Sequence, residues 1–244
     1  TTAPVLGALS EVIRTHGLPE SLYTDRAGWA VHTPKAGGPY DAQRLTQVGR
    51  ALARLGIEHV LAYSPQARGR SERVNRTVQG RLVNELRLAG IRTIQDANHY
   101  LRQRFVPRYN QSFAHPPREA ASAFVSLGRV DLDQILCHEE ERTVGQDNTV
   151  VFGKVRLQLD KQTGRRTCAG LRVLVRRHLD GTHSVWRGPR CFGRFTAQGT
   201  ARKLRPVEAA GPVDAAPRVH KDLGPLLQTA GVHSSHKAAG TLSP

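Results

Sequence analysis

Hydrophobic residues in the first 25 positions follow a helical and then a strand-like spacing. Between Val5 and Ile13 they recur three and four positions apart, and the pattern stops at Gly17 and Pro19, residues that commonly follow a helix end. A short apolar segment then runs to Asp25. The pattern predicts a helix that begins near residue 3 and packs on a sheet, followed by one strand of that sheet.

The next segments continue the alternation of helix and strand. Apolar residues at helical spacing occupy positions 45–55 and stop at Gly56, and residues 57–63 read as a short buried strand. The order strand, helix, strand predicts an α/β layer with a right-handed crossover. Residues 32–40 contain glycine and proline and predict a surface loop.

A long helix is predicted over residues 70–89. One face is apolar and can enter the core; it carries Val74, Val78 and Leu82. Another sector, about 100° wide, is polar and carries Glu72, Asn75, Arg76 and Gln79. Thr93 is a suitable N-cap for a further helix, which Pro107 is expected to end.

After about residue 142 the apolar period changes from helical to alternating. Short strands are predicted, with glycine-containing turns between them, at residues 149–152, 154–159, 171–176, 183–186 and 192–195. Strands at this spacing predict a small all-β barrel. The resulting domains are a core over residues 1–125, a linker over 126–144, the barrel over 145–205, and a tail over 206–244 whose composition predicts disorder.

Composition points to a polyanionic partner. The chain of 244 residues carries a formal net charge of +16, and most of its basic residues are arginine. Such a charge favours nucleic-acid phosphates, although an RNA or ribosome binder has the same feature, and the arginine excess is also typical of a GC-rich genome. No apolar run approaches the length of about 18 residues that spans a membrane. The cysteines, Cys137, Cys168 and Cys191, lack the spacing of a disulfide framework or a zinc site.

Two carboxylates occupy positions suited to a divalent metal. Asp25 ends its strand immediately before a turn at residues 26–28, and Glu72 opens its helix after the basic and polar run of residues 64–71. A crossover that brings a strand-end and a helix-start carboxylate together forms half of a two-metal phosphoryl-transfer site.

The motifs around these carboxylates resemble a known family. TDRAG, YSPQARGRSERVNRTVQGRL and RYNQSFAHPPREA are similar to the core of bacterial insertion-sequence transposases of the retroviral-integrase type. The resemblance covers residues 1–125, is most specific at residues 65–73, and extends weakly to about residue 205. It implies an α/β, ribonuclease-H-like integrase core followed by an SH3-like barrel.

The same resemblance assigns Asp25 to the second Asp and Glu72 to the Glu of an Asp, Asp, Glu triad. The 46 residues between them exceed the minimal family interval, and the excess falls in the predicted loop at residues 32–40. The strand that carries the first Asp in the family has no counterpart here, so the integrase core is expected to be partial. Because the chain starts with Thr and contains no Met, it is expected to be a fragment of a longer transposase or a truncated, inactive copy.

The family relation implies an activity, a metal and partners. Such enzymes nick transposon ends and join them to target DNA by two-metal chemistry, with Mg²⁺ as the metal and Mn²⁺ as a substitute. They act as multimers on paired DNA ends, in the bacterial cytoplasm and in association with the nucleoid. With two carboxylates the metal is expected to bind weakly, and the chain by itself is expected neither to cleave nor to join DNA. The alternatives are a non-catalytic DNA-binding remnant of a transposase, a nuclease of the same fold class, and an RNA-binding protein.

Candidate DNA contacts lie on the long helix and in the barrel. They are Arg68, Arg70, Asn75, Arg76 and Gln79 on the helix, and Arg172, Arg176 and Arg187 in the barrel. An ordinary solvated helix face explains Asn75, Arg76 and Gln79 equally well. Trp186 and Phe192 are either stacking surfaces for bases or residues of the barrel core.

Overall fold

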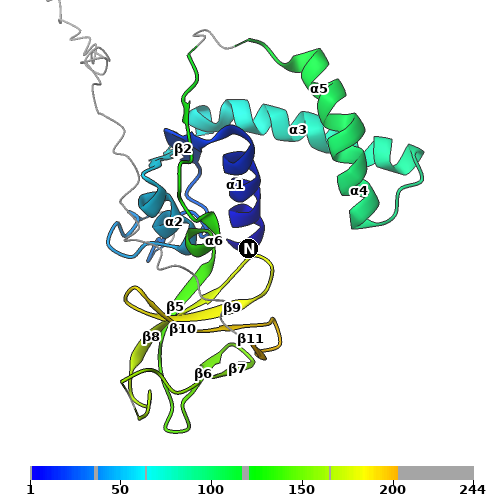
Figure 1. Cartoon of the computed structure of the whole chain (residues 1–244). Helices are drawn as coiled ribbons and strands as arrows, with labels where there is room; N and C mark the ends of the chain where they lie inside the picture. Colours follow the sequence, from blue (N-terminus) through cyan, green and yellow to red (C-terminus); the bar gives the residue numbers. More distant parts are fainter. Residues whose placement is uncertain (1, 36–37, 64, 117–120, 165, 203–244) are drawn as a thin grey trace, which may run out of the picture.

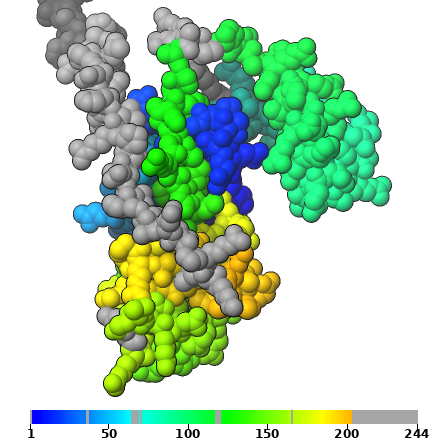
Figure 2. Space-filling model, viewed as in Figure 1, coloured from blue at the N-terminus to red at the C-terminus, as the bar shows by residue number. Residues whose placement is uncertain are grey.

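The computed structural model describes residues 2–35, 38–63, 65–116, 121–164 and 166–202, without the side chains of residues 65–68 and 70 (Figure 1). The predicted tail at residues 206–244 lies outside these ranges. Three groups of elements are visible: a body of helices and short strands, an arm of helices, and a β unit. On the face drawn in Figure 2, the arm and the β unit lie on different sides of the body. No helix in the described ranges has the length and apolar character needed to cross a membrane.

The body is built on three helices and their apolar faces. These are α1 (Thr2–His16), α2 (Gln47–Leu55) and α6 (Leu132–Ile135). Leu6, Leu52 and Leu132 are almost fully buried in their shared core, which Leu18 and Ile57 complete. The first predicted helix is therefore confirmed, but it packs mainly against helices, and Val12 of its predicted apolar stripe remains exposed.

The predicted strand, helix, strand unit is present around α2. Strands β2 (Ser21–Thr24) and β3 (Glu58–Leu61) pair in parallel, with Thr24 opposite Leu61. Thr46 caps α2 by accepting from the backbone N–H of Gly49, and Gly56 ends the helix in the left-handed conformation, with φ of 69°. A second short pair is antiparallel and joins β1 (Leu18–Pro19) to β4 (Phe124–Val125).

The arm consists of a long helix and an interrupted helix that folds back along it. Helix α3 (Pro65–Leu88) begins five residues before the predicted start, as proline in a first turn allows. Its predicted apolar face does not enter a core, because Val74 is 46% exposed and Val78 and Leu82 are only half-buried. Glu85 instead holds the returning helix by accepting from the Tyr100 hydroxyl at 2.8 Å.

The prediction that Pro107 ends the returning helix is wrong. Thr93 caps α4 (Ile94–Tyr100) as expected, and the chain continues through a π-helical turn, η1 (Leu101–Phe105), into α5 (Val106–Phe113). Within the π turn the N–H of Val106 donates to the carbonyl of Leu101, five residues earlier. Pro107 therefore lies in the first turn of α5, directly after the π turn, where a proline is tolerated.

The β unit contains all five predicted strands and additional ones. An antiparallel sheet has the order β11-β10-β9-β8-β5, and a hairpin joins β6 to β7. Their bounds are β5 His138–Thr143, β6 Thr149–Phe152, β7 Val155–Gln158, β8 Arg172–Arg177, β9 His183–Arg187, β10 Arg190–Phe195 and β11 Ala201–Arg202. One core, which includes Val150, Leu157, Val175 and Phe195, fills the space between the sheet and the hairpin.

The segment predicted to be a linker, residues 126–144, is instead integrated into both folded parts. Helix α6 contributes Leu132 and Ile135 to the body core, and β5 is the edge strand of the five-stranded sheet. Strand β5 has the sequence HEEERT, whose polar composition hides it from a search for apolar alternation.

Candidate active site

Asp25 lies in a tight turn at the carboxyl end of β2. Its Oδ1 accepts from the backbone N–H of Ala27 at 3.2 Å, which fixes the carboxylate toward the start of the turn. The neighbouring Thr24 hydroxyl donates to the Asp25 carbonyl at 2.9 Å. The turn therefore holds the carboxylate of Asp25, and the buried last residue of the strand, Thr24, holds its backbone carbonyl.

His59 supports the same strand end from β3. Its Nε2 lies 2.8 Å from the Thr24 hydroxyl oxygen, and because that hydroxyl donates to Asp25, the imidazole is assigned as the donor in this contact. Burial lowers the pKa of His59, so the neutral ring with its proton on Nε2 is the form that makes this bond. Sequence reasoning did not identify His59, since a single histidine in a predicted strand carries no motif.

A cation and an aromatic ring lie beside Asp25. The guanidinium carbon of Arg26 lies 5.5 Å from the centre of the Tyr63 ring, and Arg26 also donates to the carbonyl of Gly38 in the following loop. Tyr63 follows β3 and is 69% exposed. Arg26 thus places a positive charge at the strand end, and Tyr63 presents an open ring surface next to it.

Glu72 lies on α3, which leaves from the same edge of the β2–β3 pair. Because β3 ends at Leu61 and α3 begins at Pro65, the chain needs three intervening residues to pass from strand to helix. Glu72 was predicted to open the helix, but it lies seven residues inside it, about 10 Å along the helix axis. Its side chain is exposed, as are those of Asn75, Arg76 and Gln79. The predicted contacts of Arg68 and Arg70 fall on side chains outside the described set.

Asp25 at the strand edge and Glu72 on α3 each offer carboxylate oxygens, which suit a hard divalent cation. Within the described ranges, however, no cluster of three or more His, Cys, Asp or Glu side chains has the geometry to hold a metal ion.

The three predicted barrel arginines differ in their surroundings. Arg187 is exposed, and Arg172 is exposed and paired with Glu141. Arg176 is 14% exposed, and it donates from Nε to Glu139 Oε1 at 2.7 Å and from Nη1 to Gln134 at 2.8 Å. The guanidinium of Arg176 is consequently committed to an internal network, and its sequence spacing could not reveal this.

The predicted aromatic pair also differs. Phe192 is 4% exposed and belongs to the core of the β unit. Trp186 is half-buried, donates from its indole N–H to Ser184 at 2.8 Å, and has the guanidinium carbon of Arg176 5.1 Å from its ring centre. Phe192 is therefore a core residue of the β unit, whereas Trp186 is held in place by polar contacts.

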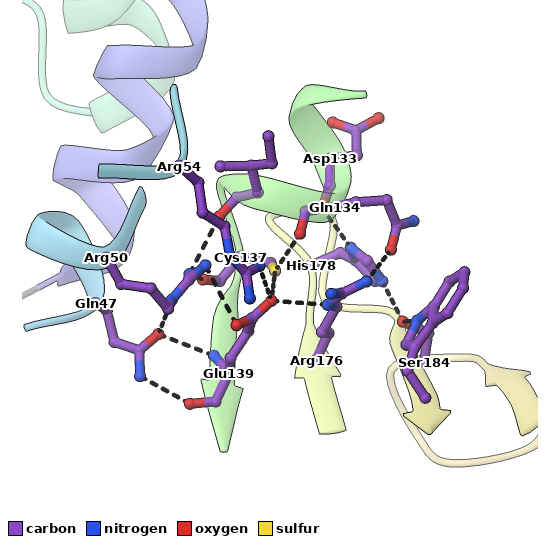
Figure 3. Close-up of polar contacts among 12 residues, drawn as sticks. Gln47, Arg50, Arg54, Asp133, Gln134, Cys137, Glu139, Arg176, His178 and Ser184 are labelled. Carbon is purple, nitrogen blue, oxygen red and sulfur yellow. Dashed lines mark hydrogen bonds and ion pairs between the residues drawn. The ribbon is translucent and has the colours of Figure 1, made fainter. Parts of the chain in front are cut away.

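Glu139 is the centre of a charged network that joins the body to the β unit (Figure 3). Its buried carboxylate forms ion pairs with Arg54 and Arg50 of α2, at 2.7 Å and 3.3 Å between guanidinium nitrogen and carboxylate oxygen. It also pairs with Arg176 of β8. Gln47 of α2 bonds both backbone groups of Glu139, donating to its carbonyl at 2.7 Å and accepting from its N–H at 2.9 Å. The network ties α2 to the first strand of the β unit.

Burial perturbs the groups around this carboxylate. Burial lowers the pKa of Arg50, and the charge of Glu139 opposes that shift. Burial raises the pKa of the Cys137 thiol to about 11, with a further contribution from Glu139, so the thiol is neutral near pH 7. Cys137 therefore acts as a small neutral residue in this network.

Comparison with curated proteins identifies related transposases. The chain is 38% identical over 185 residues to the putative transposase y4bF of Sinorhizobium fredii (strain NBRC 101917 / NGR234), a match that covers 74% of this chain and 40% of that protein. It is 32% identical over 107 residues to the transposase for insertion sequence IS1202 of Streptococcus pneumoniae, covering 44% of this chain and 23% of that protein. The chain thus spans less than half the length of either relative. No family model matches it.

Proposed function

We propose that this chain carries part of the catalytic region of an insertion-sequence transposase and that Asp25 and Glu72 are its metal ligands. The observation that carries the proposal is the position of Asp25, at the carboxyl end of a strand whose parallel neighbour leads directly into the helix with Glu72. The similarity to two proteins named transposases supplies the substrate class, DNA.

The activity that we infer is strand transfer: nicking of transposon ends and their joining to target DNA. The chemistry that Mg²⁺ or Mn²⁺ contributes to such reactions is neutralisation of developing phosphate charge and activation of the attacking oxygen. This chain's own residues orient the metal-binding carboxylate and neutralise phosphate charge. The Ala27 N–H fixes the Asp25 carboxylate, and Arg26 adds a positive charge where a phosphate would approach.

We further infer an integrase-type architecture with a ribonuclease-H-like core and an SH3-like barrel. The parallel β2–α2–β3 crossover supports the first part, since it is a fragment of the sheet that such a core requires. The five-stranded antiparallel sheet, closed over one core by the β6–β7 hairpin, supports the second.

The DNA surface that we propose combines α3 with exposed barrel arginines. Asn75, Arg76 and Gln79 lie exposed on the sector that also carries Glu72, and Arg187 is exposed on β9. The net charge of +16 favours such contacts, because each neutralised phosphate releases counterions. Assembly of several copies on paired DNA ends, in association with the nucleoid, is part of the same proposal.

A second candidate function is DNA binding without catalysis. It is favoured by the absence, among described side chains, of any cluster able to supply three metal ligands. On either reading the 244-residue chain by itself is expected to bind DNA without turnover.

The experiment that tests the proposal compares the wild type with Glu72→Gln and Glu85→Gln. Glu85 lies on the same helix but bonds Tyr100, so its variant is the matched control. Labelled DNA with transposon ends is incubated with each protein in Mg²⁺ and in Mn²⁺, and binding and strand cleavage are measured separately. We expect binding by all three proteins and no cleavage. Cleavage that Glu72→Gln abolishes and Glu85→Gln preserves would support the catalytic role and contradict the predicted inactivity.

A further inference from the structure

A pocket opens in the β unit beside β10. Its volume is about 420 Å³, and one wall consists of Gln158, the last residue of β7, and residues 160–163 after it. The other walls come from β10 and β11, and Phe192 and Phe195 lie at its apolar side. This volume falls in the range of roughly 300–1,000 Å³ that is typical of small-ligand sites.

The pocket forms where β10 departs from regular pairing. Cys191 pairs with Trp186 and Gly193 with Val185, so Phe192 is an extra residue and β10 contains a β-bulge. A Cβ at Gly193 would lie 2.8 Å from two atoms of the Phe195 ring, so any larger residue at this position would have to displace that buried ring. Bulges redirect the side chains that flank them. Here the bulge buries both phenylalanine rings and leaves Cys191 and Arg194 half-exposed in the pocket wall.

Hydrogen bonds hold the segment after β7 against β10. The Gln162 side-chain amide donates to the carbonyls of Asp160 and Phe192, each at 3.0 Å. Arg190 Nη1 donates to the carbonyl of Thr163 at 3.4 Å. The pocket therefore has two walls that are joined by side-chain contacts.

The charge of the lining is strongly positive. Four cations, Lys161, Arg190, Arg194 and Arg202, face one anion, Asp160. Within the described part of the chain, none of these four cations forms an ion pair with an acidic side chain. Arg190 and Arg194 instead lie over aromatic rings, with guanidinium carbons 5.7 Å from the centre of Phe192 and 5.9 Å from that of Trp186. Their charge remains available to an anion, and guanidinium groups match phosphate oxygens well.

We propose that this pocket receives a single unpaired nucleotide of a DNA strand, with its phosphate bound by Arg190 and Arg194. The proposal rests on the proposed function for its choice of DNA. A DNA duplex is far too wide to enter a pocket of this volume, whereas one nucleotide that is unpaired at a strand end or turned out of the helix is not. The β unit would then distinguish DNA with unpaired nucleotides at its end from blunt DNA.

The first test measures binding of the full chain to two DNAs that differ only at the end. One is a blunt duplex, and the other carries a short unpaired 3′ extension. The double variant Arg190→Ala, Arg194→Ala is compared with Arg172→Ala, Arg187→Ala, which removes the same charge from exposed residues outside the pocket. We expect the wild type to prefer the extended DNA by about tenfold, equivalent to about 1.4 kcal/mol. The pocket variant should lose this preference, whereas the control variant should weaken binding to both DNAs and retain it.

A second test uses the wild-type chain and is independent of how variants fold. Cys191 lines the pocket and is half-exposed, whereas Cys137 and Cys168 are buried. Alkylation of Cys191 at pH 8.5 is followed by mass spectrometry with no addition, with deoxyadenosine monophosphate, with blunt DNA and with extended DNA. We expect extended DNA to slow alkylation several-fold and blunt DNA to leave it unchanged. If deoxyadenosine monophosphate slows alkylation and extended DNA does not, the pocket is a site for free nucleotides and the proposal is contradicted.

Equal binding of the two DNAs by the wild type, or a preference that survives in the pocket variant, would also overturn this inference. Neither result would bear on strand transfer, because Glu72 and Asp25 lie outside the pocket. Conversely, failure of the metal site would leave the preference for unpaired ends intact. The two proposals can therefore fail separately.

Discussion

Arg54 of α2 donates from Nη1 to Glu139 Oε1 of β5 at 2.7 Å, so the body and the β unit share a buried carboxylate. The side chain of Glu139 is 4% exposed. Glu139 also forms ion pairs with Arg50 and Arg176, whose side chains are 17% and 14% exposed. A single negative charge thus compensates two buried cations and one partly exposed cation. The relative position of α2 and the β unit depends on it.

Glu139→Gln is expected to destabilise the chain strongly. The amide keeps the size of the side chain but leaves Arg50 and Arg176 buried without a counterion, which typically costs about 3–5 kcal/mol. The control is Glu141→Gln, because Glu141 pairs with Arg172 at the surface and both side chains are mostly exposed. That change should cost less than about 1 kcal/mol. Urea unfolding measures both, and equal effects would contradict the central role of Glu139.

Two glycine substitutions should change stability in opposite directions. Gly193→Ala places a Cβ 2.8 Å from the Phe195 ring and is expected to cost about 1–3 kcal/mol. Gly80 lies inside α3, and a Cβ there meets nothing within 4 Å. Gly80→Ala should therefore stabilise the helix by about 1 kcal/mol. Thermal unfolding tests the pair, and stabilisation by Gly193→Ala would show that the bulge is not needed.

Acid should destabilise the β unit through His138 and His183. Burial lowers the pKa of both, and the charge of Arg177 adds to the shift in each case. Glu140 faces His138 and Asp180 acts on His183, and both carboxylates oppose the shift. Because the unfolded histidines bind protons more readily, their contribution to stability is present above about pH 6.5. It is lost as the pH falls toward the lowered pKa of the folded state.

The measurement is the free energy of unfolding between pH 7.5 and pH 5. It should decrease as the pH falls, and His183→Gln should reduce the slope by removing one of the two titrating groups. A flat profile over this range in the wild type would contradict the assignment.

Arg187 and Arg176 should affect DNA binding differently, although both were predicted as contacts. Removing a phosphate contact lowers the slope of log K against log salt by about 0.9 for duplex DNA. Arg187→Ala is expected to do this because its side chain is exposed. Arg176→Ala should leave the slope unchanged and instead destabilise the fold, because its guanidinium binds Glu139 and Gln134. If Arg176→Ala lowers the slope of log K against log salt, Arg176 contacts DNA and this prediction is wrong.

Local signals in the sequence account for much of the fold. Gly56 was predicted to end α2 and does so because it adopts the left-handed conformation that a helix end requires, and alternation located β6 at its observed residues. These predictions succeed because short-range chemistry determines the boundaries.

Long-range contacts account for what was missed. Strand β5 is polar in sequence, and Glu139 is buried in it only because arginines from α2 and β8 surround its carboxylate. Pro107 does not end the helix, because it lies in the first turn of α5 after a π turn that sequence spacing does not reveal. For the candidate site, sequence located Asp25 at its strand end, whereas the supporting contact from His59 depends on strand pairing.

Binding of Mn²⁺ to the full chain in the presence of DNA tests the central claim most directly. It is measured by electron paramagnetic resonance for the wild type, Asp25→Asn, Glu72→Gln, the double variant, and Glu85→Gln as control. Asp25 and Glu72 are proposed to bind one site, so each single variant should lose most of the bound Mn²⁺, the double variant should lose no more, and the control should match the wild type. Undiminished Mn²⁺ binding in the double variant would contradict the assignment of these carboxylates as metal ligands.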